Sequence, residues 1–211
     1  MEINIPKKEN IQRPNREDPM FWYYFPVIGG VYKKRLANTL SLLKEKPENI
    51  LDIGYGSGIL FPELSSRSKN VFGLEIHGKE DLVIGMLKKE NIKNVILKEG
   101  SIYSIPFEDG CFDSVISISV LEHLTELNKA MLEISRVLKP KGEAVLSFPI
   151  RNFLTDLFFR LDGHDPRIIH PSSHADILNE ARKNFSVDKI IKFPNFPDSF
   201  SLYYSIKCTK K

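Results

Sequence analysis

The sequence predicts an α/β protein with a doubly wound, mostly parallel sheet, and three observations lead to this prediction. Short apolar runs alternate with helical stretches over most of the chain. A glycine-rich turn at 54–58 directly follows the first of these runs, as in a ligand-binding loop between a strand and a helix. Two strand-like runs near the C-terminus are separated by six residues, too few for a crossover, so they should pair antiparallel.

The expected elements follow from periodicity and from the residues that interrupt it. A helix is expected from Tyr32 to Leu43, where apolar residues recur every three or four positions before Pro47. A second clear helix is expected from Leu124 to Leu138. The predicted strands are short and largely apolar, as a parallel sheet covered on both faces requires: Asn49–Ile53, Asn70–Ile76, Asn94–Lys98, Asp113–Ser119, Glu143–Phe148, Phe185–Phe193 and Phe200–Cys208.

The chain of 211 residues divides, on this pattern, at about residue 31. Residues 1–31 are expected to form an N-terminal arm and aromatic cap, with the first eighteen residues loose because they are rich in charge and proline. Residues 32–211 are expected to form the main domain, with a substrate-side insertion at about 150–176.

Composition excludes several classes of protein. The net charge of +3 is too diffuse for a nucleic-acid partner, and the longest apolar stretch, Phe21–Tyr32, is too short to span a membrane. The polar N-terminus is not a signal peptide. Cys111 and Cys208 are far apart and form no C-x-x-C motif, which fits a reducing cytoplasm. We therefore expect a cytoplasmic protein; peripheral membrane contact and the oligomeric state stay open.

Two motifs point to a small ligand that carries a nucleoside. The run D-x-G-x-G-x-G, from Asp52 to Gly58, allows the backbone to approach a ligand closely. Glu75, about twenty residues later at the end of the second strand, can accept hydrogen bonds from both hydroxyls of a ribose. A nicotinamide fingerprint, G-x-G-x-x-G, would need glycine at position 59, where this chain has Ile59.

These motifs, the alternating sheet and the C-terminal hairpin resemble the class I S-adenosylmethionine-dependent methyltransferases, in the methyltransferase type 11-like branch that acts on small molecules. The resemblance runs from about Tyr32 to the C-terminus and implies seven strands in the order 3-2-1-4-5-7-6. It also implies S-adenosyl-L-methionine as the cofactor. The cofactor-binding residues that it implies are Asp52, Gly54, Tyr55, Gly56, Gly58, Glu75, Ile76, Ser101, Ile102, Ser117 and Ile118.

The resemblance implies a role for several of these residues. Asp52 would meet the ammonium of the cofactor, and Ile102 would lie against the adenine. The family usually has an acid at position 101 that accepts from the adenine amino group, so Ser101 can accept only a neutral hydrogen bond there. Ser117 and Ile118 would lie near the sulfonium.

No catalytic residue is assigned, because methyl transfer can proceed by positioning and desolvation alone. His123, His164 and His170 are the candidates for a base. No metal is expected: Ser173 is predicted to cap a helix, which leaves His170 outside that helix and separates it from His174.

Two aromatic segments, Phe21–Phe25 and Asn152–Leu161, favour a small, partly hydrophobic acceptor, although core packing or a dimer interface would use the same residues. The sequence therefore predicts an S-adenosylmethionine-dependent methyltransferase acting on such a molecule. The alternatives are a non-catalytic regulator or partner subunit that binds an adenosyl ligand and, less favoured, a nicotinamide-dependent oxidoreductase.

Overall fold

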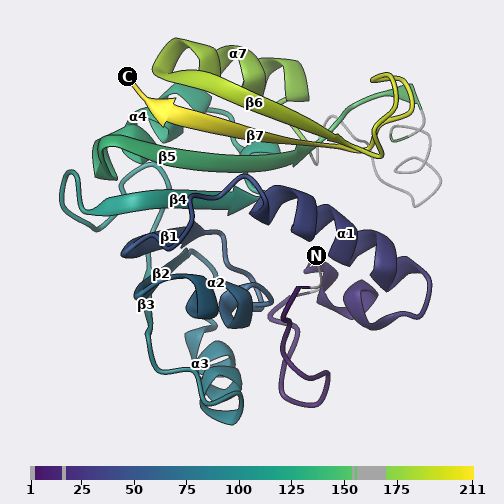
Figure 1. Ribbon diagram of the computed structural model, residues 1–211, viewed down its shortest axis with the longest axis vertical. Coiled ribbons are helices and arrows are strands. Elements are labelled where there is room, and N and C mark those ends of the chain that lie inside the picture. The colour runs from purple at the N-terminus through teal and green to yellow at the C-terminus, as the bar shows by residue number, and fades with distance from the viewer. Residues whose placement is uncertain (1–2, 16–17, 154, 156–169) are drawn as a thin grey trace.

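The structure, a computed structural model, describes residues 3–15, 18–153, 155 and 170–211. Its centre is a seven-stranded sheet in the order β3-β2-β1-β4-β5-β7-β6, which confirms the predicted topology (Figure 1). The strands are β1 (Asn49–Ile53), β2 (Asn70–Glu75), β3 (Val95–Glu99), β4 (Phe112–Ile118), β5 (Leu138–Pro149), β6 (Phe185–Phe193) and β7 (Tyr203–Lys210). The described helices are η1 (Pro19–Tyr24), α1 (Ile28–Leu40), α2 (Phe61–Arg67), α3 (Glu80–Lys89), η2 (Leu121–His123), α4 (Leu127–Val137) and α7 (His174–Asn184).

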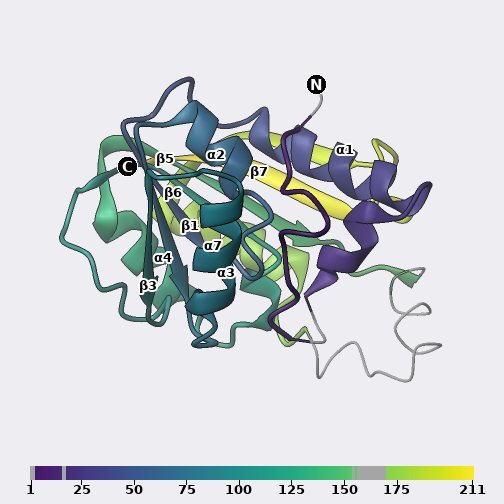
Figure 2. The ribbon, with the colours of Figure 1, turned by 90° about the horizontal axis from the view of Figure 1, so that it is seen from below.

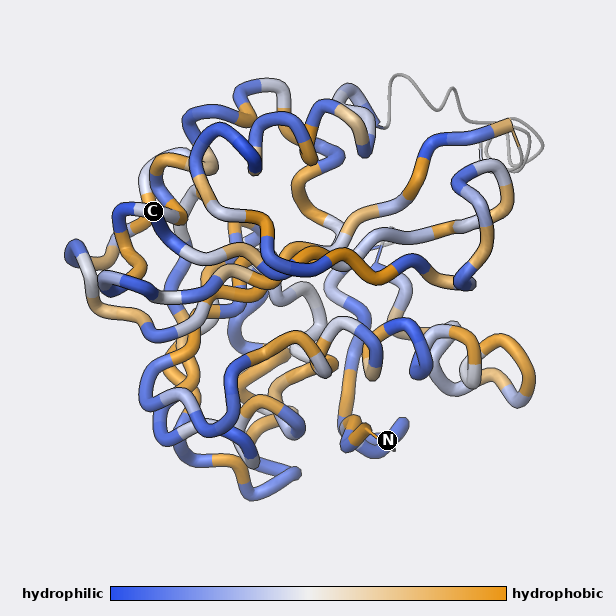
Figure 3. The backbone as a smooth tube through the Cα atoms, turned by 45° about the horizontal axis from the view of Figure 1, so that its top comes forward, coloured by the Kyte–Doolittle hydropathy of each residue, from blue (hydrophilic) through white to orange (hydrophobic). Residues whose placement is uncertain are grey.

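The first five strands are parallel, and β7 pairs antiparallel with both β5 and β6. Helices α4 and α7 cover one face of the sheet, while α1, α2 and α3 cover the other (Figures 1 and 2). Alternate residues of β1 pack into the two hydrophobic cores: Leu51 lies in the core under α4 and α7, and Ile50 lies in the core under α1, α2 and α3. The strands at the centre of the sheet are largely hydrophobic, as Figure 3 shows. Since β1 lies between β2 and β4, the winding reverses there, and ligands bind at such a switch point.

Helix α4 shows where sequence periodicity misplaced a boundary. Its buried face repeats three and four apart, as predicted, but the helix ends at Val137. Leu138, which the sequence pattern assigned to the helix, instead pairs with Phe112 and begins β5. Pro140 has no N–H to donate, so a helix cannot continue regularly through it, while the apolar Leu138 is buried equally well in a strand.

The N-terminal arm is packed against the domain rather than loose. Ile3 and Ile11 are buried. The backbone N–H of Asn4 donates to Glu63 of α2 (2.7 Å), and that of Lys7 donates to Glu90, just after α3 (2.8 Å). The charge and proline content of this segment predicted that it would be loose. In the structure, the buried Ile3 and Ile11 and the hydrogen bonds to the carboxylates of Glu63 and Glu90 hold it against the domain.

Candidate functional site

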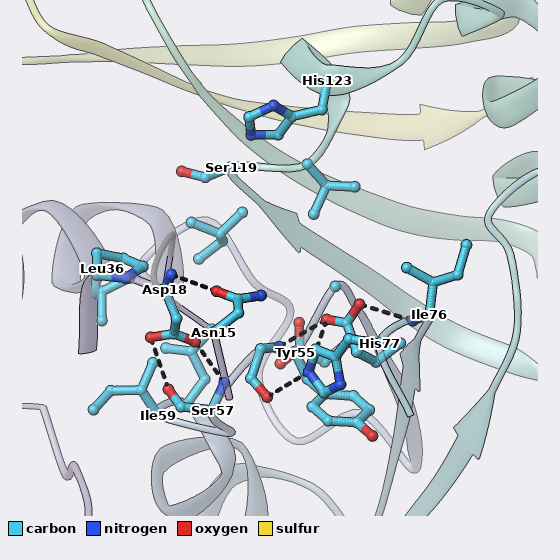
Figure 4. A pocket seen from close by; sticks show the side chains of 18 of the residues that line it. Asn15, Asp18, Leu36, Tyr55, Ser57, Ile59, Ile76, His77, Ser119 and His123 are labelled. Atoms are coloured by element: carbon cyan, nitrogen blue, oxygen red, sulfur yellow. Dashed lines mark hydrogen bonds and ion pairs between the residues drawn. The ribbon is translucent and has the colours of Figure 1, made fainter. Parts of the chain in front are cut away.

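A pocket of about 390 Å³ lies at the carboxyl ends of β1, β2 and β4, at the switch point of the sheet (Figure 4). Its walls come from the glycine loop after β1, the end of β2, the turn after β4, and the segment that enters η1. A smaller pocket of about 130 Å³ adjoins it, and the two share Gly54, Glu75, Ile76, Val120 and Leu124. The two pockets therefore lie side by side, with these residues between them.

The glycine loop takes a left-handed backbone conformation at three positions, with φ of +76° at Gly54, +52° at Gly56 and +75° at Gly58. Gly54 and Gly56 line the larger pocket, and a Cβ on Gly54 would collide with Val120. Gly58 has a different neighbourhood. A Cβ there would meet Phe61, and the described lining of both pockets leaves Gly58 out. All three glycines thus allow close packing: Val120 fills the space beside Gly54, the Asp18 carboxylate lies 2.6 Å from a Cβ placed on Gly56, and Phe61 fills the space beside Gly58.

Glu75 ties the glycine loop to β2. One of its carboxylate oxygens accepts from the N–H of Gly56 (2.9 Å), and the other accepts from the N–H of Ile76 (2.8 Å). Its side chain is 13% exposed and lines both pockets. A carboxylate has about four acceptor positions, so Glu75 retains two for a ligand's hydroxyl groups.

Asp52, the last residue but one of β1, lines the larger pocket and is almost fully buried. Burial raises the pKa of Asp52 to about 8, and the negative charge of Glu75 adds to the increase. A buried carboxyl in this state gains from a cation placed beside it, because the cation favours the ionised form.

The smaller pocket is lined by Ser101 and Ile102, which follow β3. Ile76 lies on the border of both pockets and is 69% exposed, although it is a large apolar residue. Tyr55, also predicted, lines the larger pocket. This part of the site can therefore receive a flat apolar group that covers Ile76.

The end of β4 divides between the pocket and the core. Ile118 and Ser119 line the larger pocket. Ser117 is buried in the sheet, where its hydroxyl donates to the carbonyl of Ile53 (3.2 Å), and the described lining of both pockets omits it. Successive strand residues face opposite sides, so Ser117 and Ile118 cannot both face the ligand side.

Sequence reasoning expected the N-terminal aromatic segment at the acceptor side but missed Asp18. The Asp18 carboxylate accepts from both the N–H (2.7 Å) and the hydroxyl (3.2 Å) of Ser57 in the glycine loop (Figure 4). Its other partner is the N–H of Met20 (2.7 Å), so it also caps η1. An acid directly before Pro19 is a helix-start signal that could have located this turn.

Arg35 of α1 is a second residue that the sequence analysis did not identify. It lines the pocket yet is only 4% exposed, and its guanidinium lies 4.1 Å from the centre of the Tyr203 ring. Its Nε has no hydrogen-bond partner among the described residues. A buried guanidinium with an unused donor can bind an anionic group of a ligand.

Of the three candidate histidines, His123 lines the pocket and His170 is buried beside it, with ring centres 5.0 Å apart. His164 lies outside the described residues. The predicted cap is present: Ser173 caps α7 and forms a capping box with Asp176, so His170 precedes that helix.

The N-terminal aromatic segment is partly buried and partly exposed. Tyr23 is 2% exposed and lines the pocket. Phe21, Trp22 and Phe25 contact one another edge-on or tilted and are 40–45% exposed. Most of the second segment, 152–161, lies outside the described residues.

The site as a whole suits a ligand that combines a cation, a pair of hydroxyls and a flat apolar group. Asp52 can receive the cation, Glu75 the hydroxyls, and Ile76 with Ile102 the apolar group. S-adenosylmethionine has these parts in this order, as an ammonium, a ribose and an adenine, so the residues present fit it.

Comparison with known proteins agrees with this geometry. The methyltransferase domain family matches residues 51–146. The uncharacterized methyltransferase C1B3.06c of Schizosaccharomyces pombe is 37% identical over 108 residues, which make up 46% of this chain and 38% of that protein. The matched regions span between 34% and 58% of the length of the curated relatives considered.

Solved structures share the fold. Protein PH0226 of Pyrococcus horikoshii has a TM-score of 0.70 at 22% identity, with 92% of this chain and 100% of that chain covered. The N-methyltransferase NodS of Bradyrhizobium japonicum, solved with S-adenosyl-L-homocysteine, has a TM-score of 0.68 at 16% identity, with 94% of each chain covered. Within the described residues, no helix has the length and apolar character to cross a bilayer.

Proposed function

We propose that this protein methylates a small, partly hydrophobic acceptor with S-adenosylmethionine as donor. Residues 51–146 match the methyltransferase domain family, and the sheet has the strand order implied by the resemblance to class I S-adenosylmethionine-dependent methyltransferases. One observation carries the proposal furthest. The carboxyls of Asp52 and Glu75 and the glycine loop at Gly54 and Gly56 converge on one pocket at the switch point of the sheet.

In the proposed complex, each end of the donor has a partner. The Asp52 carboxyl binds the ammonium, and the buried Arg35 guanidinium binds the carboxylate. Glu75 accepts from the ribose hydroxyls while it continues to hold the glycine loop. Ser101 and Ile102 receive the adenine in the smaller pocket.

The donor supplies a methyl group on a sulfonium, which is already a strong electrophile. The protein's part is then to hold an acceptor in line with the methyl–sulfur bond and to exclude water. Tyr23, Ile118 and Ser119 line the same pocket and are placed to form the acceptor side. Tyr23 presents a buried aromatic ring there, which suits a flat or apolar acceptor. We also propose that the reaction takes place in the cytoplasm, because Cys111 and Cys208 are far apart in the sequence and form no C-x-x-C motif, which fits a reducing compartment.

The test measures binding and turnover separately. Calorimetric titration with S-adenosylhomocysteine should give one site per chain, and titration with NAD should give no heat. Mass spectrometry should then show one methyl transferred per donor consumed for at least one acceptor in a panel of phenols, quinone precursors and aromatic amines. Binding of NAD without S-adenosylhomocysteine would overturn the proposal. Tight donor binding without turnover on any acceptor would favour an adenosyl-ligand-binding regulator or partner subunit.

A further inference from the structure

One cluster of side chains beside the pocket is not used by the donor. A carboxylate oxygen of Glu122 and one ring nitrogen from each of His123 and His170 all lie within 4.8 Å of one another. Glu122 and His123 belong to η2, the short turn after β4, whereas His170 lies just before α7. Residues nearly fifty positions apart are thus brought together at one end of the pocket.

The backbone holds these two segments together. The N–H of Ser172 donates to the carbonyl of Glu122 (3.2 Å), and the hydroxyl of Ser172 donates to the carbonyl of Leu124 (2.5 Å). These two bonds fix the segment containing His170 against η2. The two imidazoles are therefore held beside each other by the fold and need not be gathered by a ligand.

Glu122 is the most unusual member of the cluster. It is 3% exposed, and its Oε2 has no hydrogen-bond partner among the described residues. Arg35 lies on the neighbouring wall of the pocket, but no ion pair joins its guanidinium to this Glu122 oxygen. A buried carboxyl oxygen without a partner is costly, and a bound cation removes the cost by pairing with the ionised form.

We propose that Glu122, His123 and His170 bind one divalent transition-metal ion at the acceptor end of the pocket. Two imidazoles and one carboxylate suit zinc and similar ions, whereas magnesium prefers oxygen ligands alone. Ligand atoms around one such ion lie about 3 to 3.5 Å apart, given metal–ligand bonds of about 2.0–2.2 Å, so side-chain rotations must bring any more distant pair of the cluster to this separation.

The bound ion would have a free coordination position that the acceptor could occupy. Three protein ligands leave coordination positions open, and His123 faces the pocket that the acceptor enters. An acceptor hydroxyl bound there would lose its proton to solvent more easily. Its oxygen then forms the O–CH₃ bond while the S–CH₃ bond breaks, leaving a thioether, a methyl ether and one released proton. This assignment of a hydroxyl acceptor rests on the proposed function; the metal site itself does not.

The site differs from the metal pair considered in the sequence. That pair was His170 with His174, but His174 is the first residue of α7, and its Nδ1 accepts from the N–H of Arg151 (3.1 Å). His174 therefore provides a matched control.

The experiment titrates tag-free, chelator-treated protein with Zn²⁺ in the calorimeter, without donor. The wild type should bind one ion per chain. Glu122→Gln, which keeps the shape of the side chain, and His123→Gln, at an exposed position, should each weaken binding at least about 100-fold, because even the loss of an outer-shell partner typically costs 10–100-fold. His174→Gln should bind as the wild type does. Thermal denaturation of the metal-free variants checks that each is folded.

Two results would overturn the site: no Zn²⁺ binding by the folded wild type, or unchanged affinity in both ligand variants. Titration with S-adenosylhomocysteine, run separately on metal-free protein, tests the donor site. Failure of the metal site and failure of the proposed function therefore give different results. For the acceptor class, turnover of a phenol that is equally fast with and without bound zinc would contradict the hydroxyl assignment.

Discussion

Glu75 offers the sharpest test of the donor site, because one carboxylate serves two purposes. It already accepts from the N–H groups of Gly56 and Ile76, and the proposed complex adds two ribose hydroxyls. Glu75→Gln keeps the size of the side chain but replaces one acceptor oxygen with an NH₂ donor. Whichever oxygen it replaces, that donor faces a backbone N–H, of Gly56 or of Ile76, and leaves a ribose hydroxyl without its acceptor.

The size of the effect follows from the number of bonds changed. Hydrogen bonds to a charged group contribute about 1.5–3 kcal/mol each, and neutral ones about 0.5–1.5 kcal/mol. Weakening two ribose bonds in this way costs about 2–3 kcal/mol of binding free energy, so the dissociation constant should rise about 30- to 150-fold. Calorimetric titration with S-adenosylhomocysteine measures it directly.

The matched control is Glu99→Gln. Glu99 lies directly beside Glu75 in the sheet, also at the end of its strand, but it is exposed and absent from the described lining of both pockets. It should leave the dissociation constant within about twofold, since surface substitutions usually change free energies by less than about 0.5 kcal/mol. An unchanged affinity in a folded Glu75→Gln variant would refute the ribose assignment.

Two further predictions concern pH and packing. Since the pKa of Asp52 is raised to about 8, the free protein holds it protonated at pH 6–7, and binding of the donor's ammonium must release that proton. Affinity for S-adenosylhomocysteine should therefore increase about tenfold from pH 6 to pH 7 in calorimetry, and a slope that survives in Asp52→Asn would contradict this cause. Gly73→Ala places a Cβ 2.7 Å from the Tyr55 ring beneath the glycine loop, and overpacking of this kind should lower the free energy of unfolding by about 1–3 kcal/mol in urea titrations. Gly85→Ala is the control, because Gly85 lies in the interior of α3 and a Cβ placed there has no neighbour within 4 Å; it should raise the free energy of unfolding by about 0.5–1 kcal/mol. Equal destabilisation by both substitutions would show that the crowding around Gly73 is not the cause.

Local features of the sequence predicted the fold well. The strands Asn49–Ile53 and Phe185–Phe193 have the predicted bounds, because the residues that flank them cannot continue an apolar run. Leu138 was assigned to a helix, since an apolar residue next to a proline suits the end of a helix and the start of a strand equally. Where a helix or strand ends depends on pairing with other strands, and the sequence of one segment carries no information about its partners.

The candidate site was predictable only where its residues share a motif. Glu75 could be found because its distance from the glycine loop is set by one βαβ unit. Asp18 and Arg35 come from the N-terminal segment and α1, whose placement against the sheet depends on tertiary packing. The cluster of Glu122 with His170 is of the same kind, since it exists only because α7 begins beside η2.

The arrangement around η1 also provides a natural optical reporter. Trp22 is the only tryptophan of the chain, and it lies in η1. Asp18 caps this helix and also accepts a hydrogen bond from Ser57 of the glycine loop. A ligand that displaces Asp18 from Ser57 would move this helix and change the contacts of the indole with the rings of Phe21 and Phe25. Intrinsic fluorescence of the unlabelled protein should therefore follow donor binding in real time, so that stopped-flow mixing can give its rate constants.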